Sequence, residues 1–202
     1  MLRTPPHYSS LSEALASIFG SSVSARCAER LSGGDINRAY KLSLSNGEKV
    51  FMKSNARENE SFFTAESLAL SAIESTKTIG TPRIFCTGTD SGRKTPYSFL
   101  LLEFIESGRK IRNYYEVFAR ELSAMHKAAA KEFTDGKKFG FLSDNFIGAR
   151  PQKNLNSDSW VSFFRDSRLS PQFDCASSYL DENALWSFAP KWPRFCYAKL
   201  AD

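Results

Sequence analysis

Alternating apolar and polar residues predict three neighbouring strands in the first quarter of the chain. Residues 39–44 alternate with a period of two, after a weaker alternation over residues 22–31. Residues 48–53 form the next expected strand, in which a short apolar run, residues 50–52, is followed by Lys53. Asn46-Gly47 separates the last two segments, and this dipeptide is the strongest short-range signal for a β-hairpin. We therefore expect three consecutive antiparallel strands, with Lys53 at the end of the third.

The hydrophobic period then changes to that of a helix. Four residues spaced by four, four and three positions mark one face of a helix over residues 60–74: Phe62, Glu66, Leu70 and Ile73. A carboxylate on an apolar stripe is rare without a partner, and Lys53 in the preceding strand can supply one. The pattern favours an ion pair between Lys53 and Glu66. The alternative is that Glu66 lies at the edge of the stripe and reaches solvent.

Two more strands and two more helices complete the predicted fold. We expect strands over residues 83–88 and 97–105, and helices over residues 9–20 and 113–130. Residues 97–105 form a continuous apolar run, which is typical of a strand covered on both faces. The expected fold is therefore α+β. Its first lobe, residues 1–104, holds a five-stranded antiparallel sheet, and its second lobe, residues 105–202, is mainly helical.

A glycine-bearing loop precedes the predicted lysine strand. Gly33 and Gly34 in the segment 32–37 let a backbone approach a ligand closely. An ammonium withdrawn from water requires a carboxylate or a phosphate beside it. For Lys53, Glu66 can supply the carboxylate, and the glycine-bearing loop can admit a phosphate. The order of glycine loop, strand lysine and helix glutamate is that of a kinase ATP site.

Charge and composition exclude several classes of partner. The formal net charge is +5, with basic and acidic residues mixed along the chain, so we expect no nucleic-acid partner. No apolar run approaches the roughly 18–20 residues of a membrane span, and no apolar signal region opens the chain, so we expect a cytoplasmic protein without membrane contact. Two histidines and four cysteines without a Cys-x-x-Cys spacing predict no zinc site.

Four stretches resemble the fructosamine (ketosamine) 3-kinases, relatives of the aminoglycoside and choline kinases that share a protein-kinase-like fold. Three of them are the loop 32–40, the strand end 51–53 and the helix segment 62–66. The fourth and most specific is the block 139–148, which is followed by family-like residues as far as Gln172. The resemblance covers roughly residues 31–172.

This resemblance implies binding of ATP with Mg²⁺ and transfer of phosphate to the 3-hydroxyl of a ketoamine. The backbone of the segment 103–105 would hold the adenine, Lys53 would contact the phosphates and be held by Glu66, and the loop amides would cover the phosphates. The implied nucleotide-binding residues are Gly33, Gly34, Asp35, Asn37, Lys53, Glu66, Glu103, Phe104 and Ile105. The block 144–168 either shapes the sugar-amine site or packs the second lobe.

The sequence departs from the family pattern at the catalytic loop. The family carries its catalytic aspartate in a His-Gly-Asp loop and a metal ligand in a later aspartate, and neither loop is present in these residues, since His7 and His126 are followed by Tyr8 and Lys127. We assign no catalytic and no metal-binding residue. We expect an inactive fragment, cut before the catalytic loop, that can self-associate through unburied helix faces. The alternatives are a non-catalytic nucleotide-binding or scaffold module, or a kinase of the aminoglycoside or choline kinase type.

Overall fold

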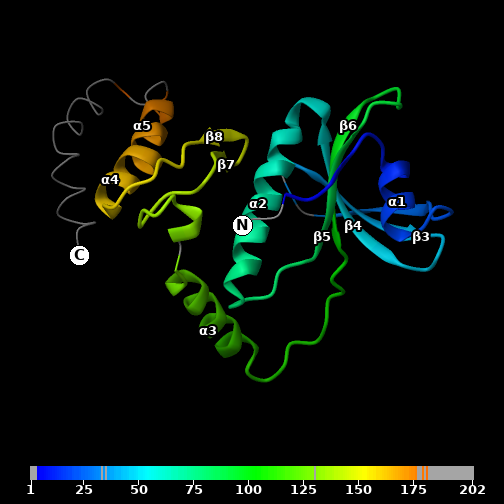
Figure 1. Ribbon diagram of the computed structural model, residues 1–202, viewed down its shortest axis with the longest axis horizontal. Helices are drawn as coiled ribbons and strands as arrows, with labels where there is room; N and C mark the ends of the chain where they lie inside the picture. The colour runs from blue at the N-terminus through cyan, green and yellow to red at the C-terminus, as the bar shows by residue number, and fades with distance from the viewer. Residues whose placement is uncertain are drawn as a thin grey trace. The chain divides into compact units, whose positions relative to one another are not determined.

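Six strands form one mixed sheet in the first part of the chain, in the order β1-β5-β6-β4-β3-β2 (Figure 1). The computed structural model describes residues 4–32, 34, 36–129, 131–176, 179 and 181. The strands are β1 (His7–Tyr8), β2 (Ala25–Leu31), β3 (Arg38–Leu44), β4 (Lys49–Ala56), β5 (Ile84–Asp90) and β6 (Tyr97–Glu103). Strands β2 to β6 pair antiparallel with one another, as predicted.

The sixth strand, β1, corrects the prediction of a five-stranded antiparallel sheet. It pairs in parallel with β5, with His7 opposite Thr87 and Tyr8 opposite Gly88. A strand of two residues is too short to leave an alternating pattern in the sequence. Gly88 makes the pairing possible, because a Cβ atom at this position would lie 2.6 Å from the carbonyl oxygen of Tyr8 and 2.4 Å from the Phe99 ring.

Strand β4 continues beyond the predicted end at Lys53. The strand runs to Ala56 because β6 keeps pairing with it, as far as Ala56 opposite Tyr97. Ser54 and Asn55 are polar, so the apolar run stops before the strand does. Lys53 therefore lies inside a central strand, where neighbours on both sides fix its backbone.

The Asn46-Gly47 hairpin between β3 and β4 is confirmed. Gly47 has a φ of 90°, which favours glycine, and the Asn46 side-chain oxygen accepts a hydrogen bond from the Glu48 N–H at 3.1 Å. This turn sets the register that places Lys53 opposite Ala39.

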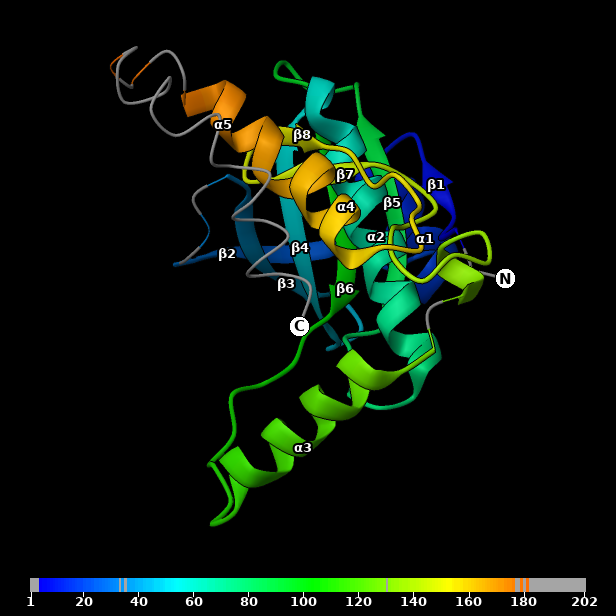
Figure 2. The same ribbon diagram turned by 90° about the vertical axis from the view of Figure 1, so that its left-hand side faces the viewer.

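Helices α1 (Leu11–Phe19) and α2 (Glu60–Thr76) cover opposite faces of the sheet (Figure 1). Leu15 of α1 packs into a core cluster with β3, β4, β5 and β6 residues. On the other face, Phe63 of α2 packs against Leu100 and Leu102 of β6, and Figure 2 shows α2 running along β5 and β6. The two faces therefore have separate apolar cores.

The most deeply buried face of α2 lies one position away from the predicted stripe. Phe63 and Ser67 are buried, whereas Phe62 and Glu66 are partly exposed. The first turn of the helix is set by a three-residue 3₁₀ turn, Arg57–Asn59, that leads directly out of β4. Glu66 thus stands at the border of the apolar face, close to solvent and close to the sheet.

Contacts divide the chain into two compact units, residues 1–128 and 129–202. The first unit also holds helix α3 (Tyr114–Lys127), and the lobe boundary expected after residue 104 stays a prediction. The described elements of the second unit are the 3₁₀ turn Lys131–Phe133, β7 (Asn145–Ile147), β8 (Arg150–Gln152), α4 (Trp160–Phe164), the π turn Arg165–Leu169 and α5 (Ser170–Ala176). Among the described residues, none of the helices has the length and apolar character to cross a membrane.

Candidate functional site

An ion pair joins the centre of the sheet to helix α2. The Nζ atom of Lys53 lies 2.5 Å from Oε1 of Glu66, which confirms the predicted pair. The two side chains are 30% and 27% exposed, so the contact is shielded from water on most sides and open on one. A carboxylate that holds an ammonium in this setting fixes the direction of its remaining N–H donors.

The glycine-bearing loop and the Lys53 side chain line one cavity of about 540 Å³. Its lining residues come from the loop and from β2, β3 and β4: Leu31, Ser32, Gly34, Ile36, Asn37, Ala39, Phe51 and Lys53. This volume is in the usual range for small-molecule sites, roughly 300–1,000 Å³. The cavity therefore combines a cationic group, an apolar wall and a loop backbone within one concave surface.

Gly34 is required by the local backbone of this loop. Its φ is 95°, a conformation that side chains disfavour, and a Cβ atom there would lie 3.1 Å from the backbone oxygen of Asn37. Gly33 and Asp35 lie outside the described residues, so their expected nucleotide contacts stay predictions.

Two asparagines tie the exit of the loop to β4. The Asn55 amide nitrogen donates to the Ile36 carbonyl at 3.1 Å and to the Asn37 side-chain oxygen at 2.7 Å. Asn59 in turn donates to the Asn55 side-chain oxygen at 3.0 Å. Neither Asn55 nor Asn59 stands out in the sequence pattern. The available signal was the spacing of two between Lys53 and Asn55, which puts both on one face of the strand.

The predicted adenine-binding segment begins at the last residue of β6 and does not line the cavity. The Glu103 N–H donates to the Arg83 carbonyl at 2.8 Å, and the Glu103 carboxylate accepts from the Arg83 N–H at 3.1 Å. The Lys41 ammonium lies 5.6 Å from the centre of the Phe104 ring, and Ile105 is 64% exposed. The adenine contacts of residues 103–105 stay predictions.

Other charges near the site form their own pairs. Lys41 lies 3.0 Å from Glu29, and Lys49 contacts Glu106 just beyond the segment 103–105. Hydrogen bonding to Lys49 holds the pKa of Glu106 below its ordinary value. Among the residues that line the cavity, Lys53 is the one with a positive charge.

The described residues contain no ready-made cluster of metal ligands. No group of three or more histidine, cysteine, aspartate or glutamate side chains in that part of the chain is close enough to hold a metal ion. In nucleotide sites Mg²⁺ usually keeps several waters and is bound by one or two carboxylates together with substrate phosphates, and we assign no such carboxylate to the described residues.

Polar residues of the block 144–168 bind one another within the second unit. Asp144 pairs with Lys153 at 2.6 Å and accepts from the Asn154 N–H at 3.0 Å, and these bonds lower the pKa of Asp144. Arg168 donates to the Lys153 carbonyl and to the Asn154 side chain, with its guanidinium over the Phe163 ring. This network supports the packing interpretation of the block, and a role in sugar binding stays a prediction.

Comparison with known proteins decides the family. The model for the family described as fructosamine kinase matches residues 7–185. The chain belongs to the fructosamine kinase family. Together with the mixed α+β architecture and its solved relatives, this membership confirms the predicted kinase-like fold.

Relatives in this family carry kinase names. A protein named "Probable ketoamine kinase" from Synechocystis sp. is 33% identical over 175 residues, 87% of this chain and 56% of that protein. A chloroplastic protein-ribulosamine 3-kinase of Oryza sativa is 34% identical over 158 residues, 77% of this chain and 43% of that protein. A crystal structure provisionally described as a fructosamine-3-kinase, from Haemophilus somnus, superposes with a TM-score of 0.72 at 26% identity, over 84% of this chain and 54% of that one. This fructosamine kinase chain thus spans about half the length of the relatives it matches.

Proposed function

We propose that this chain is the nucleotide-holding part of an ATP-dependent ketosamine 3-kinase. The observation that carries the proposal is the Lys53–Glu66 pair, which faces a cavity beneath a glycine-bearing loop. The kinase names of its relatives support the same reaction class. The acceptor we propose is the 3-hydroxyl of a fructosamine or ribulosamine, whose phosphorylation labilises the sugar-amine bond and frees the amine. We propose that the reaction takes place in the cytoplasm.

The described residues, in this proposal, position the phosphates and the base of the nucleotide. Lys53 has three N–H donors, and Glu66 occupies one of them, so two remain for phosphate oxygens. Backbone amides near Gly34 can add donors along the same phosphates without the cost of moving a side chain. Phe51 provides an apolar wall for the flat base. Mg²⁺ would neutralise phosphate charge when bound, and we assign none of its ligands to described residues.

Proton acceptance from the sugar hydroxyl is assigned to no residue of this sequence. The 202 residues contain neither a His-Gly-Asp nor an Asp-Phe-Gly sequence. We therefore expect residues 1–202 by themselves to bind nucleotide without transferring its phosphate to fructosyl-lysine. A non-catalytic nucleotide-binding module is the second candidate function, and the same absence favours it for these residues taken alone.

Thermal unfolding with and without nucleotide tests the proposal. We expect ATP to raise the Tm of the 202-residue chain, since a ligand that binds the folded state stabilises it by mass action. Lys53→Met should abolish the rise, whereas Lys94→Met, at an exposed lysine outside the cavity lining, should keep it. An equal rise in both variants would refute the assigned role of Lys53.

Acceptor assays separate the proposed substrate from the other kinase types. Fructosyl-lysine, an aminoglycoside and choline would be compared in a full-length relative of this chain that contains the catalytic loop. Phosphorylation of fructosyl-lysine alone supports the ketosamine assignment. Phosphorylation of choline or the aminoglycoside in preference would replace it.

A further inference from the structure

A second cavity lies on the opposite face of the same sheet, away from Lys53. Helix α1 is nine residues long, which corresponds to roughly 14 Å at 1.5 Å per residue. It packs over the end of the sheet where Leu42, Leu44 and Val50 lie. The other end of this face, formed by the start of β3, the end of β4 and the start of β6, borders a cavity of about 490 Å³.

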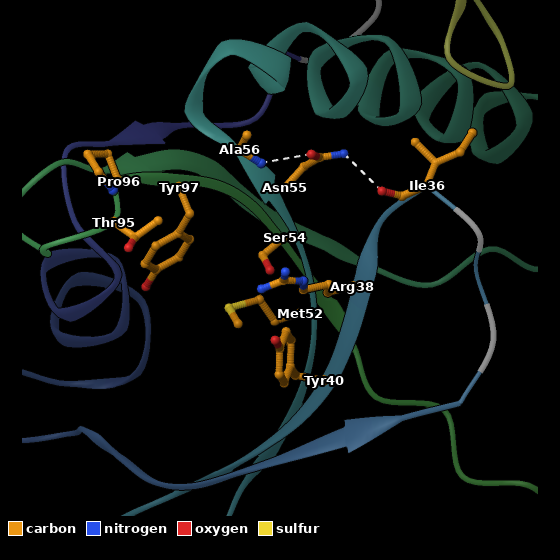
Figure 3. Close-up of a pocket in the computed structure, with 10 residues that line it drawn as sticks. All are labelled: Ile36, Arg38, Tyr40, Met52, Ser54, Asn55, Ala56, Thr95, Pro96 and Tyr97. Carbon is orange, nitrogen blue, oxygen red and sulfur yellow. Dashed lines mark hydrogen bonds between the residues drawn. The ribbon is translucent and has the colours of Figure 1, made fainter.

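Ten residues line this back-face cavity, and Figure 3 draws their side chains. They are Ile36, Arg38, Tyr40, Met52, Ser54, Asn55, Ala56, Thr95, Pro96 and Tyr97. The view places Thr95, Pro96 and Tyr97 on one side and Arg38 and Tyr40 on the other, with Met52 and Ser54 between them. The volume is adequate for a small organic molecule.

Ser54 contributes a hydroxyl to the lining of this cavity. The residue as a whole is only 8% exposed, and no hydrogen bond to its hydroxyl is present in the described part of the chain. The neighbouring Ser98 is also buried, but its hydroxyl donates to the Ala56 carbonyl at 2.9 Å. Because no protein group occupies it, the Ser54 hydroxyl is available to donate to a ligand in the cavity.

Arg38 supplies a positive charge that no ion pair of the described residues satisfies. The lysines of β3 and β4 are each paired with a glutamate: Lys41 with Glu29, Lys49 with Glu106, and Lys53 with Glu66. Arg38 lies on the opposite face of the same two strands and has no carboxylate partner in that part of the chain. None of the ten lining residues is acidic.

The walls of the cavity are largely apolar. Met52 is buried, and Tyr40 and Tyr97 pack with one side against the core of this face. The Tyr97 hydroxyl donates a hydrogen bond to Asp90 at 3.3 Å, and Asp90 is not among the lining residues. The aromatic ring of Tyr97 is therefore the part that forms a wall of the cavity. Burial and the nearby Asp90 charge raise the pKa of Tyr97 to about 12, so the phenol stays neutral and does not repel an anion.

We propose that the back-face cavity is a binding site for a small carboxylate with a flat apolar body. The carboxylate binds the Arg38 guanidinium, whose planar donors match its two oxygens, and accepts a further hydrogen bond from Ser54. The apolar body lies between Tyr40 and Tyr97 over Met52. One cation in the lining fits a monoanion better than a phosphate ester, which carries nearly two charges at neutral pH. The site does not depend on nucleotide binding at Lys53, which faces the other side.

NMR titration of the 202-residue chain with 3-phenylpropionate tests the site. We expect saturable shifts of the backbone amides at Arg38, Ser54 and Tyr97, and weaker or no shifts with the neutral 3-phenylpropionamide. Arg38→Met should weaken the affinity by at least about tenfold, because a hydrogen-bonded charge pair is lost. Ser54→Ala should weaken it several-fold.

Arg26→Met is the matched control, since Arg26 is an exposed arginine on β2 that does not line the cavity. Its affinity should equal that of the unmodified chain. Should Arg38→Met fail to fold, Arg38→Lys and Ser54→Ala decide, because the lysine keeps the charge and loses the two-pronged geometry. The proposal is overturned if no saturable shift appears by about 10 mM ligand, if the amide binds as well as the acid, or if the Arg38 and Arg26 variants bind alike.

Discussion

At the scale of single residues, the partner of each charged group decides what that group can do. Lys53 and Arg38 lie on neighbouring strands, yet Lys53 is held by Glu66 and Arg38 has no described ion pair. A held ammonium is pre-oriented for a ligand on its open side. An unpaired guanidinium adapts its direction to the ligand that arrives. The two cavities therefore offer different kinds of anion site.

Replacing Glu66 tests how much the held ammonium stabilises the fold. Glu66→Gln should lower the free energy of unfolding by about 1–2 kcal/mol, because the partly buried Lys53 loses its charged partner. Urea unfolding followed by circular dichroism measures the change. Glu58→Gln, at an exposed glutamate next to α2, should stay within about 0.5 kcal/mol of the unmodified chain. An unchanged Glu66→Gln protein would show that the pair contributes nothing to stability.

Tyr97 should make the stability of the fold depend on alkaline pH. Its folded-state pKa is raised to about 12 from an ordinary value of 10.0 by burial and by Asp90. The folded state therefore keeps a proton that the unfolded state releases, so this contribution is complete below pH 10 and is lost as the pH rises towards 12. The Tm of the unmodified chain should fall more steeply over this window than the Tm of Tyr97→Phe.

Cys86 also contributes to the pH dependence of the Tm, and Tyr115 provides a control. Burial also raises the pKa of Cys86 to about 12, so part of the alkaline loss should persist in Tyr97→Phe. Tyr115→Phe, at a residue that is 68% exposed, should follow the unmodified chain at every pH. Identical pH profiles for Tyr97→Phe and Tyr115→Phe would contradict the assigned burial of the Tyr97 hydroxyl.

At the scale of elements, short strands and close approaches determine how the sheet is completed. Strand β1 adds only two residues, but it brings the N-terminal segment against β5 and is followed directly by α1. The Ser10 hydroxyl at the start of α1 accepts from the Glu13 N–H, and the Glu13 carboxylate accepts from Ser9. These bonds at the first turn fix where the helix begins. The position of α1 therefore depends on the pairing of β1.

Gly88→Ala tests that dependence. The added methyl group would lie 2.6 Å from the Tyr8 carbonyl and 2.4 Å from the Phe99 ring, so β1 or the core must shift. Overpacking of this kind typically costs about 1–3 kcal/mol, which chemical denaturation would detect. Gly80→Ala is the control, because a Cβ atom there meets no other atom within 4 Å. Equal stability of the two variants would show that β1 is not held closely at Gly88.

The sequence predicts the elements of this sheet well where the pattern is long, and poorly where a contact is local. Periodicity identified the hairpin, the Lys53 strand and the Glu66 helix, because each of these has one face buried and one face open. It missed β1, which is too short for a period, and the end of β4, where Ser54 and Asn55 are polar. It also missed the Asn55 tether and the back-face cavity. A hydrogen bond to a distant loop and an uncovered area of sheet leave no periodic signal.

At the scale of the whole molecule, the candidate nucleotide cavity belongs to one compact unit. All of its lining residues lie within residues 1–128. The second unit, residues 129–202, contains its own network of charge pairs and aromatic contacts, including Phe139 with Trp160. The chain itself corresponds to about half the length of its relatives.

Residues 1–128 expressed alone should fold and keep the nucleotide-induced rise in Tm. The sheet and both of its apolar cores are complete within this unit, so most of its buried area is retained. Differential scanning fluorimetry with ATP would measure the rise, with Lys53→Met in the same shortened chain as control. A folded unit without the rise, in contrast to the 202-residue chain, would show that residues 129–202 contribute to the affinity.

The alternation of side chains along β4 has a consequence for how this protein can change. Lys53 lines the cavity on one face of the sheet, and its neighbour Ser54 lines the cavity on the other face. Strand β4 therefore separates the two proposed binding sites. Deleting a single residue between the Asn46-Gly47 turn and Lys53 would turn the side chains of the rest of β4 to the opposite face of the sheet. Lys53 and Ser54 would then exchange faces, and both cavities would lose their binding groups. Removing two adjacent residues would restore the parity, so tolerance to deletions in this segment should follow an odd–even rule.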